Sequence, residues 1–256
     1  MMDAEVERYL SALVQTARRV LGRNLIAAYG AGSVALDDYL PGRSDIDVAL
    51  VCEDRLPLEQ KQALVARLRH EALPCPARGL ELVVYRRTVA QSGTREPGFE
   101  VELNSGARME FRATYGVDDR PAADGRFWYA LDRSILRQSG YVLFGPPAEE
   151  MFADLSPADL RALLGEALSW WLARPTPSDD RPAAGAEDAV LGACRSLVRF
   201  RDGVWLSKDA AGHRLVELGI SAELIGRCLQ ARRGGAAPNQ VEARAFQQEV
   251  LDEIRG

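Results

Sequence analysis

The chain has 256 residues, of which 47% are hydrophobic and 27% are charged, so it can bury a sizeable core and is expected to fold. Thirty-two basic against 37 acidic residues give a formal charge of −5, which argues against nucleic acid or an anionic membrane as a partner and favours a cationic small molecule. The N-terminus lacks the apolar core of a secretory signal, and no stretch approaches the roughly 20 apolar residues of a membrane span. A cytoplasmic location is therefore expected.

Cysteine and histidine are scarce, and this narrows the chemistry. Neither a disulfide framework nor a zinc site is expected, because the cysteines are far apart and form no paired ligand spacing. Reactions that need histidine are also disfavoured, so any catalysis is expected to rest on carboxylates. The residues concerned are Cys52, Cys75, Cys194, Cys228, His70 and His213.

The first half of the chain mixes helical and strand periods. Apolar residues at helical spacing predict a helix over residues 3–21, and an apolar run then predicts a buried strand that ends at Gly30. Alternating residues around Asn104-Ser105-Gly106 predict a hairpin with its turn at these three residues. The predicted strands are 25–29, 46–51, 80–85 and the hairpin 99–113, with a helix over 58–73 between the second and third.

From Gly125 onward the pattern is almost wholly helical, which predicts a helical bundle. We place a domain boundary near residue 154, giving an α/β domain over 1–154 and an all-α domain over 155–256. The segment Pro175 to Gly185, rich in Pro, Asp and Ala, is expected to be a flexible loop between two helices. The predicted helices lie near 126–138, 158–172, 187–200, 208–218, 221–231 and 239–254.

The strongest local signal is a pair of aspartates at the start of a buried strand. Asp45 and Asp47 flank Ile46, so the two carboxylates share one face of the strand while Ile46 faces the core. Such a pair can hold Mg²⁺, which takes oxygen ligands from one or two carboxylates and from substrate phosphates. Upstream, Gly32 and Ser33 follow the first strand and could open a helix whose free N–H groups and hydroxyl receive a phosphate.

A third carboxylate strengthens this interpretation. Glu81 stands within an otherwise apolar strand, where an unpaired buried charge is costly. It is either an outward-facing residue of an edge strand, or a general base or third metal ligand beside the aspartate pair. We favour the functional alternative, because an unpaired charge inside an apolar strand would be costly.

At these residues the sequence resembles a known family. Gly32-Ser33 with Ser44-Asp45-Ile46-Asp47 resembles the polymerase-beta-like nucleotidyltransferase superfamily. Over roughly residues 20–220 the chain resembles the aminoglycoside 3''-adenylyltransferases, the streptomycin/spectinomycin resistance enzymes, in the strand Leu80–Val84 and in the segment Tyr141–Phe152. The resemblance implies a nucleotidyltransferase domain with a mixed sheet, followed by a helical domain, with the active site between them.

The resemblance also implies a mechanism and site residues. ATP would bind with Mg²⁺, as two ions, held by Asp45, Asp47 and Glu81, and Glu81 would take a proton from the attacking hydroxyl. The nucleotide contacts implied are Gly32, Ser33, Ser44, Arg195 and Lys208. For a cationic acceptor, Trp171 offers an aromatic wall and Glu187 and Asp188 offer carboxylates, with Asp179 and Asp180 as further acidic candidates. A monomer is expected.

Some positions depart from the family pattern, and these departures leave alternative functions to be considered. Arg108 stands where the family carries a tryptophan, and an arginine would repel a cationic drug. Leu36-Asp37-Asp38 replaces a Gly-Gly after the Gly-Ser, and Trp171 could simply be a core residue beside Trp170. The alternatives are a nucleotidyltransferase that acts on another small-molecule or protein hydroxyl, and a nucleotide-binding regulatory protein without turnover.

Overall fold

The computed structural model describes residues 3–176 and 181–256. The chain divides into two compact units, Met1–Ser156 (unit 1) and Pro157–Gly256 (unit 2). The first contains a sheet covered by helices, and the described part of the second is helical. The α/β and all-α organisation predicted from the sequence is therefore confirmed.

Unit 1 is built on a six-stranded mixed sheet in the order β5-β4-β3-β2-β1-β6. Strands β2 and β3 are parallel, and every other neighbouring pair is antiparallel. A parallel pair needs a crossover, and the helix α3 (Leu58–Leu68) supplies it. The strands are β1 (Leu25–Gly30), β2 (Ile46–Cys52), β3 (Leu80–Arg86), β4 (Phe99–Gly106), β5 (Met109–Thr114) and β6 (Tyr141–Phe144).

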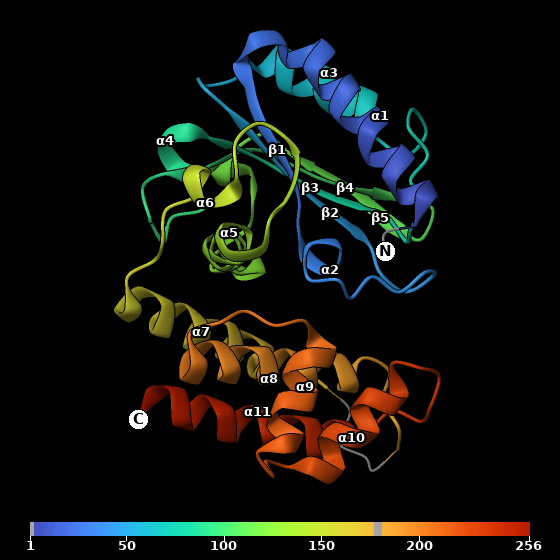
Figure 1. The fold of residues 1–256 in the computed structure, drawn as a ribbon, viewed down its shortest axis with the longest axis vertical. Helices are drawn as coiled ribbons and strands as arrows, with labels where there is room; N and C mark the ends of the chain where they lie inside the picture. Colours follow the sequence, from blue (N-terminus) through green and yellow to red (C-terminus); the bar gives the residue numbers. More distant parts are fainter. Residues whose placement is uncertain (1–2, 177–180) are drawn as a thin grey trace. The chain divides into compact units, whose positions relative to one another are not determined.

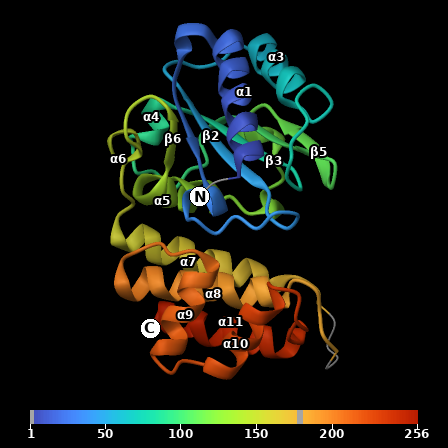
Figure 2. The ribbon, with the colours of Figure 1, turned by 45° about the vertical axis from the view of Figure 1, so that its right-hand side comes forward.

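Helices cover both faces of this sheet. Figures 1 and 2 show α1 (Ala4–Leu21) and α3 on one face, and α5 (Trp128–Ser139) on the other together with the short helices α4 (Arg87–Ala90) and α6 (Ala148–Met151). Strand alternation divides the apolar residues between two buried clusters, and this explains why β2 reads as a continuous apolar run. Ile46, Val48 and Leu50 belong to the cluster of α1 and α3, whereas Ala49 and Val51 belong to that of α5.

Within its described residues, unit 2 consists of five helices. Helix α8 packs against α7, α9, α10 and α11, and its inner side is fully buried from Val190 to Val198. Ser207 caps α9, and Asn239 forms a capping box with Glu242 at the start of α11, as expected for these residue types. The helices are α7 (Pro157–Ala173), α8 (Ala186–Asp202), α9 (Lys208–Glu217), α10 (Ala222–Ala231) and α11 (Gln240–Arg255).

Three local predictions need correction. The segment from Tyr141, where the sequence analysis expects no strand, forms the edge strand β6 and pairs with β1, a contact that its short sequence does not signal. The helix expected to run to Leu73 ends at Leu68, since the His70 N–H donates to Ser105 Oγ at 2.8 Å and not to a helical carbonyl.

The hairpin is present, but its turn lies at Ala107-Arg108 and not at residues 104–106. Gly106 belongs to β4, where a Cβ would approach the Cα of Gly79 to 2.3 Å and the carbonyl of Arg78 to 2.5 Å. Its glycine is thus required by close backbone packing and not by a turn. The predicted loop at 175–185 includes residues 177–180, which lie outside the described residues.

Two of the exclusions drawn from composition can be compared with the structure. None of the helices in the described part of the chain is long and apolar enough to cross a membrane. All four cysteines are free thiols in the structure, and all four are buried. Burial raises the pKa of the Cys52 thiol to about 12, which leaves it unreactive at neutral pH.

A buried ion pair in unit 1 gives a test of the fold. Lys61 Nζ lies 2.9 Å from Glu100 Oε2, with both side chains less than 10% exposed. Replacing Lys61 by Met removes one of the two cations that pair with the buried Glu100 carboxylate, while Arg86 Nε stays 2.9 Å from its Oε1. We therefore expect a loss of about 1–3 kcal/mol in the free energy of unfolding. Urea unfolding measures it. Arg87→Met, at the exposed pair with Glu53, is the matched control and should cost less than about 1 kcal/mol; equal losses would contradict the argument.

Candidate active site

Four neighbouring strands place a row of polar side chains on one face of the sheet. The register pairs Asp47 of β2 with Glu81 of β3, Glu81 with Asn104 of β4, and Asn104 with Arg112 of β5. Directly paired residues point to the same side, about 4.8 Å apart between strands. The predicted proximity of Asp47 and Glu81 thus follows from the parallel pairing of β2 and β3.

The Asp47 carboxylate lies against the backbone of the loop after β1. A Cβ at Gly32 would lie 1.8 Å from Asp47 Oδ2, and the φ of Gly32 is +52°, so only glycine fits without a shift. The Ala31 N–H donates to the Asp47 carbonyl at 2.9 Å. These contacts fix the Gly32-Ser33 loop directly beside the aspartate.

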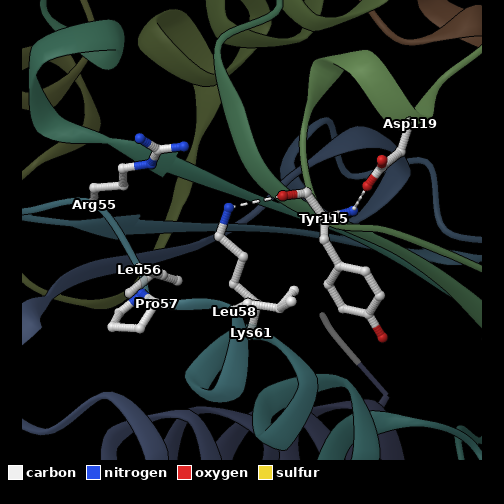
Figure 3. A pocket seen from close by; sticks show the side chains of 7 residues that line it. All are labelled: Arg55, Leu56, Pro57, Leu58, Lys61, Tyr115 and Asp119. Carbon is white, nitrogen blue, oxygen red and sulfur yellow. Dashed lines mark hydrogen bonds between the residues drawn. The ribbon is translucent and has the colours of Figure 1, made fainter.

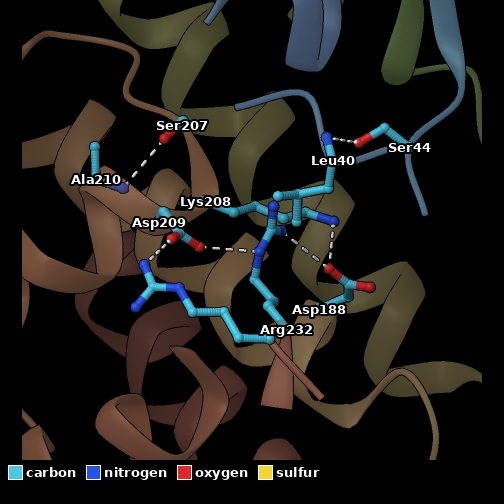
Figure 4. A network of polar contacts seen from close by, with 9 residues as sticks. Leu40, Ser44, Asp188, Ser207, Lys208, Asp209, Ala210 and Arg232 are labelled. Carbon is cyan, nitrogen blue, oxygen red and sulfur yellow. Dashed lines mark hydrogen bonds and ion pairs between the residues drawn. The ribbon is translucent and has the colours of Figure 1, made fainter. Parts of the chain in front are cut away.

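The one-turn helix α2 (Gly32–Ala35) begins at this loop, as the Gly-Ser signal predicts. Ser33 Oγ is buried, and no residue in the described part of the chain forms a hydrogen bond with it. A buried hydroxyl without a partner is costly unless a ligand satisfies it, so Ser33 has the properties of a ligand contact. Ser44 is used differently: its Oγ accepts the Leu40 N–H at 3.0 Å and closes the loop before Asp45 (Figure 4).

Glu81 is half-buried and its proton affinity is altered. Burial, and then the negative charges of Asp45 and Asp132, raise the pKa of the Glu81 carboxyl to about 7, and Arg78 opposes the rise. Arg78 also lies 3.7 Å from Asp45, measured from NH2 to Oδ2. A carboxylate with a pKa near neutrality is suited to accept a proton and release it again.

Two residues of this region escaped the sequence analysis. Asn104 Nδ2 donates to Glu81 Oε1 at 3.4 Å and can orient that carboxylate. Asp132 of α5 contributes a further negative charge that acts on Glu81 beside that of Asp45. Asn104 was assigned to a turn, and Asp132 reads as an exposed residue of an amphipathic helix, so no sequence signal distinguishes either one. Strand register and helix packing bring them to the site.

The donor set fits a magnesium ion held jointly with phosphates. Among the described residues, no three His, Cys, Asp or Glu side chains converge closely enough to form a metal site by themselves. Asp45 and Asp47 nevertheless provide two carboxylates at the start of one strand, which is the usual protein contribution to a magnesium site completed by substrate phosphates and water. Glu81 as a third ligand remains a prediction.

The remaining predicted residues lie in unit 2. Arg195 packs over the ring of buried Trp205, and Lys208 at the start of α9 pairs with Asp188. Glu187 is buried and its Oε2 accepts the Gly185 N–H at 3.1 Å, so most of this carboxylate faces the protein.

The predicted aromatic wall of unit 2 is on the surface. Trp171 is 42% exposed, forms an edge contact with Trp170 and has the Arg174 guanidinium 5.2 Å from its ring centroid. The exposed part of the ring is accessible to a cation from solution, although Arg174 already contacts the ring. Of the acidic candidates, Asp179 and Asp180 lie outside the described residues.

A separate hollow in unit 1 has a different character. Its volume is about 530 Å³, and Figure 3 shows that Lys61 points into it while donating to the Tyr115 carbonyl at 2.7 Å. None of the site carboxylates lines it. It therefore lacks the groups that the predicted chemistry needs, and its lining is Arg55, Leu56, Pro57, Leu58, Lys61, Tyr115 and Asp119.

No family model matches the chain, but one curated relative and one solved structure are similar to it. The chain is 28% identical over 264 residues to an aminoglycoside (3'')(9) adenylyltransferase of Escherichia coli, covering 99% of this chain and 95% of the relative. Its fold matches the crystal structure of spectinomycin adenyltransferase AAD(9) from Enterococcus faecialis with ATP and spectinomycin, with a TM-score of 0.66 and 16% identity over 97% of this chain and 99% of that one.

By sequence and fold, the chain is a homologue of proteins of the nucleotidyltransferase class. Within that class, the chain is homologous over nearly its full length to one aminoglycoside (3'')(9) adenylyltransferase. The resemblance read from the sequence motifs is thereby confirmed.

The raised pKa of Glu81 predicts a cost to stability. A Glu whose pKa rises from 4.5 to about 7 on folding destabilises the fold when ionised: the cost is absent below pH 4.5, grows between these values and is complete above pH 7. Glu81→Gln should therefore raise the free energy of unfolding of the metal-free protein by about 1–3 kcal/mol near pH 8, and by much less near pH 5. Urea unfolding at the two pH values measures it.

The control for this comparison is Glu110→Gln, at an exposed position of β5, which should change stability little at either pH. A gain for Glu81→Gln that does not depend on pH would argue against ionic strain at Glu81.

Proposed function

We propose that the protein transfers AMP from Mg·ATP to a hydroxyl of an aminoglycoside-type antibiotic of the streptomycin/spectinomycin class, releasing pyrophosphate and conferring resistance. The observation that carries the proposal is the pairing of Asp47 with Glu81 beside the Gly32-Ser33 loop. The names of the relatives support the choice of substrates: one is an aminoglycoside adenylyltransferase, and the other was solved with ATP and spectinomycin.

Each of the candidate site residues in unit 1 has a defined part in the proposed reaction. Asp45 and Asp47 would hold magnesium, which when bound neutralises phosphate charge and polarises the bond to the leaving group. The α2 backbone and the Ser33 hydroxyl bind phosphate oxygens. Glu81 accepts the proton of the acceptor hydroxyl as its oxygen bonds to the α-phosphorus, and the bond from the α-phosphorus to the bridging oxygen breaks, so that pyrophosphate leaves.

Unit 2 supplies charged and aromatic groups. By resemblance, Arg195 and Lys208 bind the triphosphate, and Trp171 and Glu187 contribute to the acceptor site. Asp188, the other acidic candidate of α8, pairs with Lys208. A cytoplasmic location and a monomeric state remain predictions.

One observation supports a second candidate function with the same chemistry. Arg108 is exposed at the tip of the β4–β5 hairpin, where a cation disfavours a polycationic acceptor. The alternative is adenylyl transfer to another small-molecule or protein hydroxyl. A purely regulatory nucleotide-binding role is disfavoured, since it has no use for a proton acceptor with the pKa of Glu81.

The first test is release of pyrophosphate from Mg·ATP with streptomycin, spectinomycin, kanamycin or no acceptor. We expect release that depends on streptomycin or spectinomycin and that falls at least about 100-fold in Glu81→Gln, because the proton acceptor is lost. Product mass confirms addition of AMP. ATP binding without release for any antibiotic would direct the search to another acceptor, and Arg108→Trp would then be compared with the native chain.

The contact of Gly32 with Asp47 gives a second test. Gly32→Ala places a methyl group on the Asp47 carboxylate, and since small displacements of catalytic groups are costly, we expect kcat to fall by about 100-fold. Gly22→Ala is the matched control: its φ is also positive, at +59°, but a Cβ there meets nothing within 4 Å. It should share the backbone strain and keep its kcat, and similar kcat losses in both variants would show that strain alone is responsible.

A further inference from the structure

Lys208, the predicted phosphate contact of unit 2, is held by a carboxylate. Its Nζ donates to Asp188 Oδ1 at 2.8 Å, and the two side chains are 31% and 35% exposed. Figure 4 shows Asp188, on α8, directed toward the Lys208 ammonium at the start of α9. The pair therefore fixes a side chain that would otherwise be free to rotate about four bonds.

The carboxylate is itself anchored from the protein interior. The Arg232 side chain is only 5% exposed; its Nη1 donates to Asp188 Oδ1 at 3.4 Å, and its Nε forms an ion pair with Asp209 Oδ1 at 3.0 Å. Asp209 also accepts from Arg233 NH2 at 2.8 Å. These alternating charges form a chain that ends at Lys208 and connects α8, α9 and the end of α10 (Figure 4).

Helix stability does not account for a lysine at this position. A cation in the first turn opposes the helix dipole, and an acidic residue is favoured there. Asp209 already supplies that acid in α9, and Ser207 already caps the helix. A cation at the position of Lys208 therefore slightly destabilises α9, and the ion pair with Asp188 offsets this. A lysine retained at such a position is expected where its ammonium binds a ligand.

We propose that Asp188 is a positioning residue for Lys208 and not a contact of the acceptor. This inference rests on the proposed function, in which Lys208 binds the triphosphate. An ammonium has three donors, so Lys208 can keep its bond to Asp188 and still offer two to phosphate oxygens. Protein kinases use the same physical arrangement, in which a glutamate holds the lysine that contacts the phosphates.

The kinetic test separates the two roles of Asp188. In Asp188→Asn we expect KM for ATP to rise about tenfold with KM for the acceptor unchanged, since an amide holds the ammonium weakly. Asp188→Glu keeps the charge and should recover part of the loss. Combined with Lys208→Met, Asp188→Asn should add no further loss, because the group that it positions is gone.

Asp202→Asn is the matched control: it removes a carboxylate from the same helix, one that is 31% exposed and pairs with Arg214, and it should leave both KM values unchanged. A rise in KM for the acceptor alone would show that Asp188 contacts the acceptor, and it would overturn the proposal. Tighter ATP binding in Asp188→Asn would show a competing counter-ion and would also overturn the proposal, as would full additivity with Lys208→Met.

Equilibrium binding of Mg·ATP distinguishes this proposal from the proposed function. If the native protein binds ATP but turns over no antibiotic, only the acceptor assignment is contradicted. The native protein and Asp188→Asn are then compared by their dissociation constants for ATP. Native protein that binds ATP while Asp188→Asn binds it equally well would overturn the positioning role alone. Failure of the folded native protein to bind ATP would overturn both.

Discussion

The parallel pairing of β2 with β3 is the constraint on which the candidate site depends. It places the Asp47 and Glu81 side chains on one face at neighbouring positions. The same pairing requires the crossover through α3, and the polar residues then lie on the face of the sheet that α5 covers. There, burial and the charges of Asp45 and Asp132 raise the pKa of Glu81 to about 7. Burying the Glu81 carboxylate near other acids lowers the stability of the fold. Such a loss of stability is consistent with a site arranged for catalysis.

Backbone packing around this pair is as restrictive as the charges. The backbone of Gly32 packs directly against the Asp47 carboxylate, and the same loop buries a Ser33 hydroxyl that has no hydrogen-bond partner in the described part of the chain. One loop therefore fixes a metal-ligand candidate and presents a polar group to a ligand. On the other side, the β4 residue Asn104 supports Glu81. The site is thus supported by strands and a tight loop, which hold geometry better than long flexible segments.

Unit 2 uses a different physical device. Its predicted cations are held by neighbouring groups: Arg195 packs on Trp205, and Lys208 is joined through Asp188 to the buried Arg232. Alternating charges reduce the repulsion between cations that would otherwise gather at a phosphate site, and they restrict rotamers before a ligand binds. Glu187, adjacent to Asp188 in the sequence, instead faces inward and bonds to the Gly185 backbone.

The sequence by itself determined most of the helices and strands and singled out the carboxylates of the candidate site. Strand alternation placed Asp45 and Asp47 on one face, an acid in an apolar strand identified Glu81, and helical periodicity located every long helix, because these signals are local. Tertiary structure alone decided the register that joins Asp47 to Glu81 and Asn104, the edge strand β6, and the pairing of Asp188 with Lys208 across two helices. Such contacts depend on which distant segments pack together, and no local pattern of residues encodes that choice.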